Sequence, residues 1–301
     1  MRKEFVEKIL KIMKDDSEVI FFTGDLGYGS FEVIQNQFPE RYYNVGIAEQ
    51  NMIGTACGLG LTGKKVIIYS IANFTTFRVL EQIRNYLIYH EIKALIVNGG
   101  GGFSYGQLGY THHSVEDVSV MKSLPYIEVY APYDKSGIDR AIDLWLIKDK
   151  VAYLRLEKSI LPDGLETSSF TNCRIIGGVE SLNMIITYGG IIAEALKVKE
   201  YLASKNIDLT IVVLNSLKNI DGDLVKMVNG KNKVAVLEEN VIYGGIGESF
   251  FAKCCINNIK IGKSKIFGVD DFISDVIGDQ NYMRKLHGIV ANDLIEYFGG
   301  A

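Results

Sequence analysis

Apolar residues along the first half of the chain follow two alternating patterns. Phe5, Ile9, Ile12 and Met13 are spaced as on one face of a helix. Short, continuous apolar runs then recur, each bounded by glycine or polar residues, as is typical of strands buried on both faces of a sheet. The predicted strands are residues 19–22, 65–70, 93–97, 126–130 and 152–156. Because helical segments separate these strands, the pattern predicts a parallel, doubly wound α/β sheet.

The pattern changes between residues 159 and 176, where turn-forming and polar residues replace the apolar runs. Further apolar runs at residues 184–187, 209–213 and 234–237 predict a second, smaller α/β unit. A chain of 301 residues is long enough for two domains of about 150 residues each. We therefore expect two doubly wound α/β domains, residues 1–165 and 177–301, with residues 159–176 as the linker.

The composition and charge of the chain exclude several classes of partner. Its 48% hydrophobic and 23% charged residues are ordinary for a soluble globular protein. The formal net charge of −4 at pH 7 gives no electrostatic argument for nucleic-acid binding. No apolar run approaches the roughly 18 residues of a membrane-spanning helix, and the N-terminal residues are too charged for a secretory signal. The four cysteines lack paired CxxC spacing, which indicates reduced thiols and a cytoplasmic location.

Residues 41–54 run from a short, half-apolar strand through Gly46 into a segment with helical spacing. Glu49 falls in the first turn of that helix, on or near its apolar side. A helix N-terminus favours the charged carboxylate, whereas burial favours the protonated form. From spacing alone, the favoured interpretation is a glutamate that complements the helix dipole.

Other polar features follow predicted strands. Asp25 comes directly after a buried strand, where ligands gather in open α/β sheets, although an aspartate there can also shape a glycine-flanked turn. The four glycines at 99–102 lack the Lys-Ser/Thr pair of a phosphate loop, and we interpret them as a flexible active-site loop. His112 and His113 are adjacent, but no carboxylate or cysteine beside them has metal-ligand spacing. We therefore expect no metal site within this chain.

The run Gly46-Ile47-Ala48-Glu49-Gln50-Asn51 resembles the segment that carries the cofactor-activating glutamate in the transketolase family of thiamine diphosphate enzymes. Four further segments match that family in the same order, at residues 70–74, 81–85, 110–117 and 236–247. Together they cover most of the chain. The resemblance implies a pyrimidine-binding domain with a parallel sheet, followed by a smaller domain like the transketolase C-terminal domain.

The resemblance also implies which residues contact the cofactor. Glu49 matches the glutamate that hydrogen-bonds the pyrimidine nitrogen N1′, and an acidic residue at the position of Asp25 faces the cofactor. Ile47 is implied as a further cofactor contact. The helix after the strand at 65–70 supplies the platform for the pyrimidine. There the alignment places Arg78 at one pocket position and leaves Ala72 and Thr75 at two others, so the available aromatic residues are Phe74 and Phe77.

Substrate contacts follow from the same resemblance. His112 matches the family histidine above the reactive thiazolium carbon, where a neutral imidazole polarises a carbonyl or shuttles protons. His113 replaces the usual glutamine and is expected to reach the substrate. Lys158 aligns with the family arginine for the sugar phosphate but lacks its bidentate fork. Gly100 stands in place of a phosphate-contacting histidine, so a modified or nucleotide-linked sugar is an alternative to ordinary pentose phosphates.

Family members bind the diphosphate through a Gly-Asp-Gly motif and Mg²⁺, and this chain contains no Gly-Asp-Gly. The resemblance therefore implies the C-terminal subunit of a split transketolase, which transfers a two-carbon ketol unit between a ketose donor and an aldose acceptor. An N-terminal partner subunit would supply the Mg²⁺ ligands, and the chain would form a homodimer within an α2β2 assembly. The alternatives are a 1-deoxyxylulose-5-phosphate-synthase-like subunit, a 2-oxo acid dehydrogenase E1 β-like subunit and a non-catalytic assembly partner.

Overall fold

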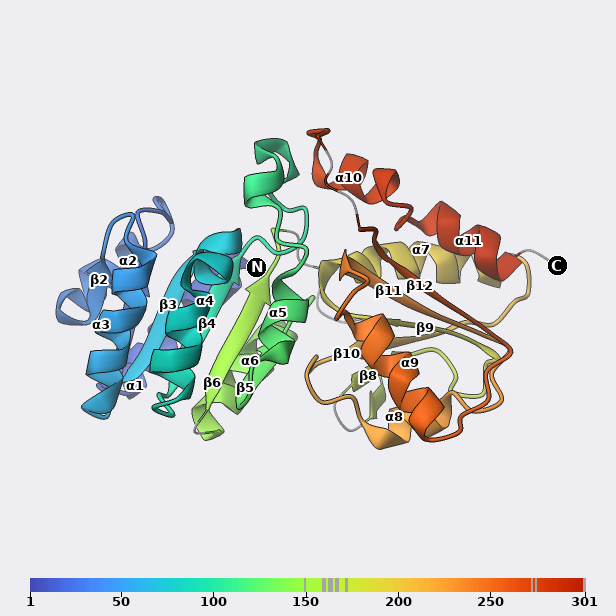
Figure 1. Cartoon of the computed structure of the whole chain (residues 1–301), viewed down its shortest axis with the longest axis horizontal. Coiled ribbons are helices and arrows are strands. Elements are labelled where there is room, and N and C mark those ends of the chain that lie inside the picture. Colours follow the sequence, from blue (N-terminus) through green and yellow to red (C-terminus); the bar gives the residue numbers. More distant parts are fainter. Residues whose placement is uncertain are drawn as a thin grey trace.

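The computed structural model describes residues 1–148, 150–158, 161, 165, 168–170, 173–271, 273 and 275–299. Figure 1 shows two α/β units side by side, each built on a twisted sheet with helices packed against it. Within the described residues, no helix combines the length and the hydropathy needed to cross a membrane.

The first unit contains a six-stranded sheet with the order β2-β1-β3-β4-β6-β5, and all its strand pairs are parallel. The strands are β1 (Val19–Thr23), β2 (Tyr42–Asn44), β3 (Lys65–Ile71), β4 (Ala94–Gly99), β5 (Ile127–Tyr130) and β6 (Val151–Leu156). The α-helices are α1 (Arg2–Asp15), α2 (Glu32–Gln37), α3 (Glu49–Leu61), α4 (Leu80–Gln82), α5 (Asp117–Ser123) and α6 (Lys135–Ile147). Strands β1, β4, β5 and β6 are buried along their whole length, as expected for a sheet covered on both faces. The predicted doubly wound parallel sheet is confirmed.

Short helical turns lie between these elements. They are η1 (Pro39–Arg41), η2 (Ala72–Thr75), η3 (Phe77–Val79), the π-helical η4 (Ile83–Ile88), η5 (Gly106–Leu108) and η6 (Tyr110–His112). Turns η2 and η3 follow β3, and turns η5 and η6 lie between β4 and α5. Ligands bind at the carboxyl ends of strands in open α/β sheets, so these turns lie where a site is expected.

The second unit contains a mixed sheet with the order β12-β11-β9-β10-β8-β7. Its strands are β7 (Ser168–Phe170), β8 (Cys173–Ile176), β9 (Asn183–Thr187), β10 (Thr210–Leu214), β11 (Lys233–Val241) and β12 (Lys263–Val269). Its helical segments are η7 (Gly189–Ile191), α7 (Ile192–Ala203), α8 (Gly222–Met227), α9 (Ile246–Ile256), α10 (Gln280–Leu286) and α11 (Ala291–Gly299). Strands β9 to β12 pair in parallel, whereas β8 pairs antiparallel with both β10 and β7.

Strands β7 and β8 lie within the segment that the sequence pattern predicts as a linker. Cys173, Ile175 and Ile176 of β8 are buried, and β8 is hydrogen-bonded to β10 over its whole length. Polar and turn-forming residues precede this short strand in the sequence, and its pairing with β10 is a contact that a local pattern does not show. The prediction of a linker at 159–176 is therefore wrong for residues 168–170 and 173–176. Its residues 159, 160, 162–164, 166, 167, 171 and 172 lie outside the described residues.

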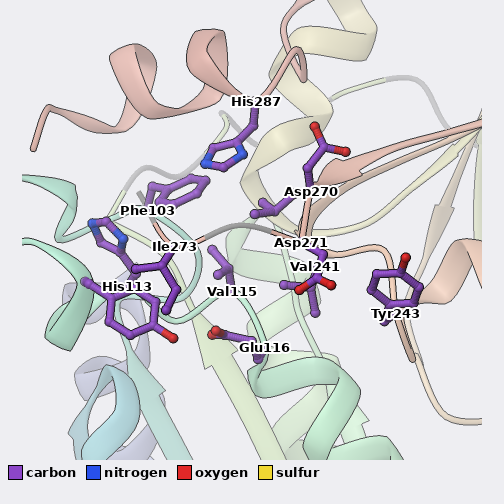
Figure 2. Close-up of a pocket in the computed structure, with 12 residues that line it drawn as sticks. Phe103, His113, Val115, Glu116, Val241, Tyr243, Asp270, Asp271, Ile273 and His287 are labelled. Carbon is purple, nitrogen blue, oxygen red and sulfur yellow. The ribbon is translucent and has the colours of Figure 1, made fainter. Parts of the chain in front are cut away.

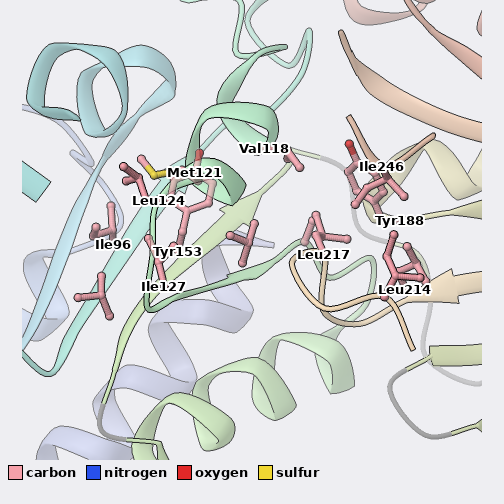
Figure 3. Close-up of a cluster of buried hydrophobic side chains, with 14 of the residues drawn as sticks. Ile96, Val118, Met121, Leu124, Ile127, Tyr153, Tyr188, Leu214, Leu217 and Ile246 are labelled. Atoms are coloured by element: carbon pink, nitrogen blue, oxygen red, sulfur yellow. The ribbon is translucent and has the colours of Figure 1, made fainter. Parts of the chain in front are cut away.

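The two units share an apolar contact. Figure 3 shows Met121, Leu124 and Ile127 of the first unit in one cluster of buried side chains with Leu217 and Ile246 of the second. All five side chains are at most 7% exposed. Because burial of continuous apolar surface is the main stabilising contribution in folding, this cluster stabilises the two units as one body.

Candidate active site

Glu49 is the first residue of α3 and lies at the carboxyl edge of the first sheet. Its side chain is 4% exposed. Gly24 follows β1, and a Cβ atom placed on it would lie 3.6 Å from Glu49 Oε1 and 3.6 Å from Ser70 Oγ. The carboxylate therefore lies between the ends of β1 and β3, close to a buried serine hydroxyl.

A chain of contacts links Glu49 to His112. Arg78 Nη1 lies 2.7 Å from Glu49 Oε2, in an ion pair. The Arg78 guanidinium lies over the ring of Phe74, with its carbon 4.0 Å from the ring centroid. Phe74 in turn contacts His112 edge to face, with the ring centroids 5.5 Å apart. The structure thus brings together four of the residues predicted for the site, from α3, η2, η3 and η6.

His112 is half-buried, and its Nδ1 lies 3.0 Å from Thr111 Oγ1. Asn73 Nδ2 donates to the carbonyl oxygen of Thr111 at 3.2 Å, which ties η6 to η2. With Nδ1 engaged by Thr111, Nε2 is the ring nitrogen that remains for exchanging a proton with a bound molecule.

Buried hydroxyl groups near this edge test whether a heteroaromatic group fits beside Glu49. Ser70 Oγ and Thr75 Oγ1 are buried and have no hydrogen-bond partner within the described part of the chain. Buried polar atoms are rarely left without a partner in native structures. Together with the Glu49 carboxylate, they suit a ligand with ring nitrogens and an amino group, such as an aminopyrimidine.

Asp25, Ile47 and Phe77 lie on the same edge of the sheet but face solvent. Ile47 is 81% exposed and Phe77 is 41% exposed. Asp25 is exposed, and its Oδ1 accepts a hydrogen bond from the hydroxyl of Tyr28. Within the described residues, no hydrogen bond or ring contact joins these three to Glu49. A ligand bound beside Glu49 would reach these three side chains only if it extended towards solvent.

Lys158 lies beside a cavity of about 370 Å³ at the carboxyl ends of β4 and β6. Its Nζ is 4.0 Å from the centroid of the Tyr105 ring. Arg2 lines the same cavity and donates to the hydroxyl oxygens of Tyr69 at 3.1 Å and Tyr105 at 3.3 Å. Neither Lys158 nor Arg2 forms an ion pair with a carboxylate of the described residues. Two cations without a counter-ion therefore converge on one cavity, which favours an anionic ligand.

The ionisation of the groups around this cavity supports the same conclusion. Burial, followed by the nearby charge of Arg2, lowers the pKa of Lys158. Burial of the Arg2 guanidinium acts to lower its pKa. The phenolic oxygens of Tyr69 and Tyr105 have a larger combined effect in the other direction, so the pKa of Arg2 is raised. Glu157 also lines the cavity, and its pKa is raised by burial and then by the charge of Glu239. The mutual repulsion of the cations is relieved if an anion binds between them.

His113 points into a different cavity. This cavity has a volume of about 340 Å³ and lies between the two units, where Figure 2 shows His113 and His287 on either side of Phe103. His113 is 3% exposed, and its Nε2 donates to the carbonyl oxygen of Gly106 at 3.3 Å. Burial lowers the pKa of both imidazoles. The structure therefore separates His113 from His112, and substrate contact by His113 stays a prediction.

Arg2, Tyr69 and Tyr105 were not among the residues that the sequence predicts for the site. Arg2 is one of several charged residues in the first helix, and no spacing sets it apart. Its contacts with Tyr69 and Tyr105 join residues that are 67 and 103 positions apart in the chain. In the described ranges, no group of three or more histidine, cysteine, aspartate or glutamate side chains is arranged to hold a metal ion.

Two family models match the chain. Residues 1–163 match the model described as "Transketolase, pyrimidine binding domain", and residues 182–273 match the one described as "Transketolase, C-terminal domain". The first match includes every residue of the contact chain from Glu49 to His112.

Relatives and solved structures agree with these matches. A protein from Methanocaldococcus jannaschii, named as a transketolase C-terminal section, is 31% identical over 279 residues and covers 89% of this chain and 87% of its own. A 6-deoxy-6-sulfo-D-fructose transketolase subunit from Clostridium sp. (strain MSTE9) is 29% identical and covers 98% of this chain and 92% of its own. A solved split gene transketolase, an inactive beta4 tetramer, superposes with a TM-score of 0.86 at 24% identity, over 100% of this chain and 97% of that one. At that identity the superposition bears on the fold alone.

Proposed function

Since the chain belongs to the transketolase family, we propose that it is the C-terminal subunit of a two-chain, thiamine diphosphate-dependent transketolase. Such an enzyme transfers a two-carbon ketol unit from a ketose donor to an aldose acceptor. The observation that carries the proposal is the continuous contact from Glu49 through Arg78 and Phe74 to His112 at one edge of the pyrimidine-binding domain. When bound, thiamine diphosphate supplies the carbon nucleophile that accepts the two-carbon unit.

Glu49 is proposed to hold a proton in a hydrogen bond between its carboxyl group and the pyrimidine nitrogen N1′. Its burial supports this role, because a desolvated carboxyl group shares a proton with a base more readily than a solvated one does. Arg78 and Phe74 form the platform beside it, and Ser70 offers a buried hydroxyl without a partner within the described residues. Asp25, Ile47 and Phe77 are proposed to contact parts of the cofactor that extend beyond Glu49.

His112 is proposed to exchange a proton with the substrate at Nε2, or to polarise its carbonyl group. Support comes from the Thr111 contact, which engages Nδ1, and from the edge contact with Phe74, which fixes the ring next to the platform. Proton transfer by a positioned imidazole contributes about 10²- to 10⁴-fold to the rates of such reactions.

Lys158 and Arg2 are proposed to hold an anionic end of the sugar. Lys158 is a point charge and does not require the geometry of one particular anion, so it fits both a phosphate and a sulfonate. The Clostridium relative is named for a sulfonated sugar, which supports an anion other than phosphate as one choice. The cavity of about 370 Å³ leaves room for more than the anion alone.

The Gly-Asp-Gly motif and the Mg²⁺ ligands are proposed to reside on a separate N-terminal subunit, within an α2β2 assembly in the cytoplasm. The relative named as a subunit supports a two-chain enzyme. The similar solved structure is described as an inactive β4 tetramer, which is consistent with self-association of such chains. The exposed side chains of Ile47 and Phe77 beside the site also suit a surface that another subunit covers.

Reconstitution tests the proposal. The chain is purified alone and together with a Gly-Asp-Gly-containing partner, and each sample is assayed with thiamine diphosphate, Mg²⁺, a ketose and an aldose. We expect ketol transfer by the two-chain complex only. Condensation of pyruvate with glyceraldehyde 3-phosphate would indicate a deoxyxylulose-phosphate synthase, and oxidative turnover of a 2-oxo acid would indicate a dehydrogenase subunit. A complex that binds cofactor but catalyses none of these reactions would favour the non-catalytic alternative.

A further inference from the structure

The loop that carries His112 is closed at its base by a pair of backbone hydrogen bonds. Gly102 N donates to Ser114 O at 2.8 Å, and Ser114 N donates to Gly102 O at 2.9 Å. Residues 103–113 form the excursion between these two positions and include turns η5 and η6. The orientation of His112 therefore depends on what holds the base of this loop.

Strand β11 of the second unit holds that base on both sides. Glu239 Oε1 accepts a hydrogen bond from Phe103 N at 2.7 Å. On the other side of the loop, Val241 N donates to Val115 O at 2.7 Å. The first unit contributes Arg155, whose Nη2 donates to the backbone oxygen of Glu239 at 2.9 Å.

The Glu239 carboxylate is itself fixed on every side. It is 1% exposed, and its Oε2 accepts from Arg284 Nε at 2.8 Å. Gln280 Nε2 lies 3.0 Å from Oε1 and 3.2 Å from Oε2. Burial of the Arg284 guanidinium acts to lower its pKa. The negative charges of Glu239 and then Glu157 have a larger combined effect, so the pKa of Arg284 is raised. A buried carboxylate with this many donors has little freedom to move, so it is a rigid acceptor for Phe103 N.

The glycine run is the part of the loop that meets this cluster. A Cβ atom on Gly101 would lie 2.0 Å from Arg155 Nε, and one on Gly102 would lie 2.6 Å from Glu239 Cδ. Gly102 also has a φ of +63°, which disfavours other residues. All four glycines are buried, and a Cβ atom on Gly99 or Gly100 would meet Tyr69 or Tyr105 of the first unit. The run therefore serves close packing and is not the flexible loop that we expected from the sequence.

Phe103 adds an aromatic contact to the same junction. Its ring stacks on His287 of the second unit, with the centroids 5.2 Å apart and the planes 12° apart, and Figure 2 shows the pair side by side. On its other side, Phe103 meets the edge of His113 at 5.1 Å. Phe103, whose backbone nitrogen donates to Glu239, is thus also held between His287 of the second unit and His113.

We propose that Glu239 is a positioning residue for catalysis, through which the second domain fixes the loop that presents His112. The proposal rests on the proposed role of His112. In this proposal the second domain positions a loop of the active site, although no residue of the second domain belongs to the contact chain from Glu49 to His112.

Hydrogen exchange at Phe103 tests the tether directly on the full chain. In Glu239→Gln, an NH₂ group replaces one of the two carboxylate oxygens, so the side chain cannot accept hydrogen bonds at both the Phe103 and the Arg284 positions. We therefore expect the backbone amide hydrogens of the peptide containing Phe103 to exchange about tenfold faster or more. In the two-chain complex we expect kcat to fall by about tenfold or more, because His112 is less often in place. Exchange of the C2 proton of the bound cofactor depends on Glu49, so we expect it to stay within about twofold of the wild type.

Glu238→Gln is the matched control, because it removes the adjacent buried carboxylate of the same strand. Glu238 accepts from Ile246 N and Gly247 N at the start of α9 and makes no hydrogen bond to the loop. We expect exchange at Phe103 and kcat to stay at wild-type values in this variant. If Glu239→Gln fails to fold, Glu239→Gln combined with Arg284→Gln removes both charges and avoids an arginine without its acid.

Unchanged exchange at Phe103 in a folded Glu239 variant would overturn the proposal, and so would faster exchange without loss of kcat. An equal loss of kcat in Glu238→Gln would also overturn it, because the effect would then be a general one of the second domain. If the wild-type complex transferred no ketol unit, the proposed function would fail, and exchange at Phe103 would decide the tether alone.

Discussion

Arg78 Nη1 lies 2.7 Å from Glu49 Oε2, so the buried carboxylate at the start of α3 faces a cation held on the ring of Phe74. The pair joins two helical segments that are separated by strand β3 in the chain. Phe74 also contacts His112, so Glu49 and His112 lie at opposite ends of one chain of contacts, and their proposed roles concern the cofactor and the substrate respectively. The two residues can therefore be tested by different measurements.

Glu49→Gln is expected to slow exchange of the C2 proton of the bound cofactor by about 100-fold or more, because the amide cannot take part in proton sharing with N1′. Folding and assembly should change little, since the amide keeps the shape of the side chain. Exchange is followed by NMR on the two-chain complex, with Glu40→Gln, which removes an exposed carboxylate, as the control. Wild-type exchange in Glu49→Gln would show that Glu49 does not activate the cofactor.

His112→Ala is expected to lower kcat by about 100-fold while cofactor affinity changes by less than about threefold, because the imidazole acts on the substrate. Steady-state kinetics and a cofactor titration on the same preparation separate the two effects. His90→Ala changes an exposed histidine and should have no effect on either. Loss of cofactor binding with normal turnover at saturation would assign His112 to the cofactor instead.

Lys158→Ala is expected to raise KM for an anionic sugar by about tenfold, because one charge-assisted contact to the anion is lost. KM for an uncharged donor should be unchanged, and the effect on the anionic sugar should weaken as salt is added. Lys226→Ala, on the surface of the second unit, removes the same charge away from the cavity. Equal changes in KM for charged and uncharged donors would mean that Lys158 does not bind the anion.

Glu238 is expected to make stability depend on pH. Burial is the main cause that raises the pKa of its carboxyl group from an ordinary 4.5 to about 7. The folded state holds the proton of Glu238 more tightly than the unfolded state does. The stability that this proton contributes is therefore complete below about pH 4.5 and is lost as the pH rises through about 7. The expected loss of unfolding free energy over this window is about 3 kcal/mol. Urea denaturation at a series of pH values measures it as the difference between wild type and Glu238→Gln, and identical pH profiles would refute the assignment.

The sequence predicted the first unit well because its signals are local. Strands such as β1 and β4 are continuous apolar runs between helical segments, and this pattern alone specifies a parallel sheet. Glu49 was found through a short run of residues around it, and the structure places that run at the start of α3. Such features depend on residues within a few positions of one another.

The remaining features depend on contacts between distant positions. Gly101 and Gly102 pack against Arg155 and Glu239, and nothing in the glycine run itself indicates these partners. The adjacent histidines 112 and 113 have different surroundings, since His112 contacts Phe74 and His113 contacts Phe103. Strand β8 was taken for linker because its burial comes from pairing with β10, about 40 residues later. Local patterns cannot specify these relationships, since each depends on a partner that is distant in the sequence and comes close only when the chain folds.

The central claim is that this chain completes a thiamine diphosphate site only together with a second subunit. The most direct measurement is a calorimetric titration of thiamine diphosphate, with and without Mg²⁺, into the chain alone and into its complex with a Gly-Asp-Gly-containing partner. Most charge-assisted contacts to the diphosphate are expected to come from the partner and its Mg²⁺. We expect no measurable binding to the chain alone and tight, Mg²⁺-dependent binding to the complex. Tight, Mg²⁺-dependent binding to the chain alone would contradict the claim.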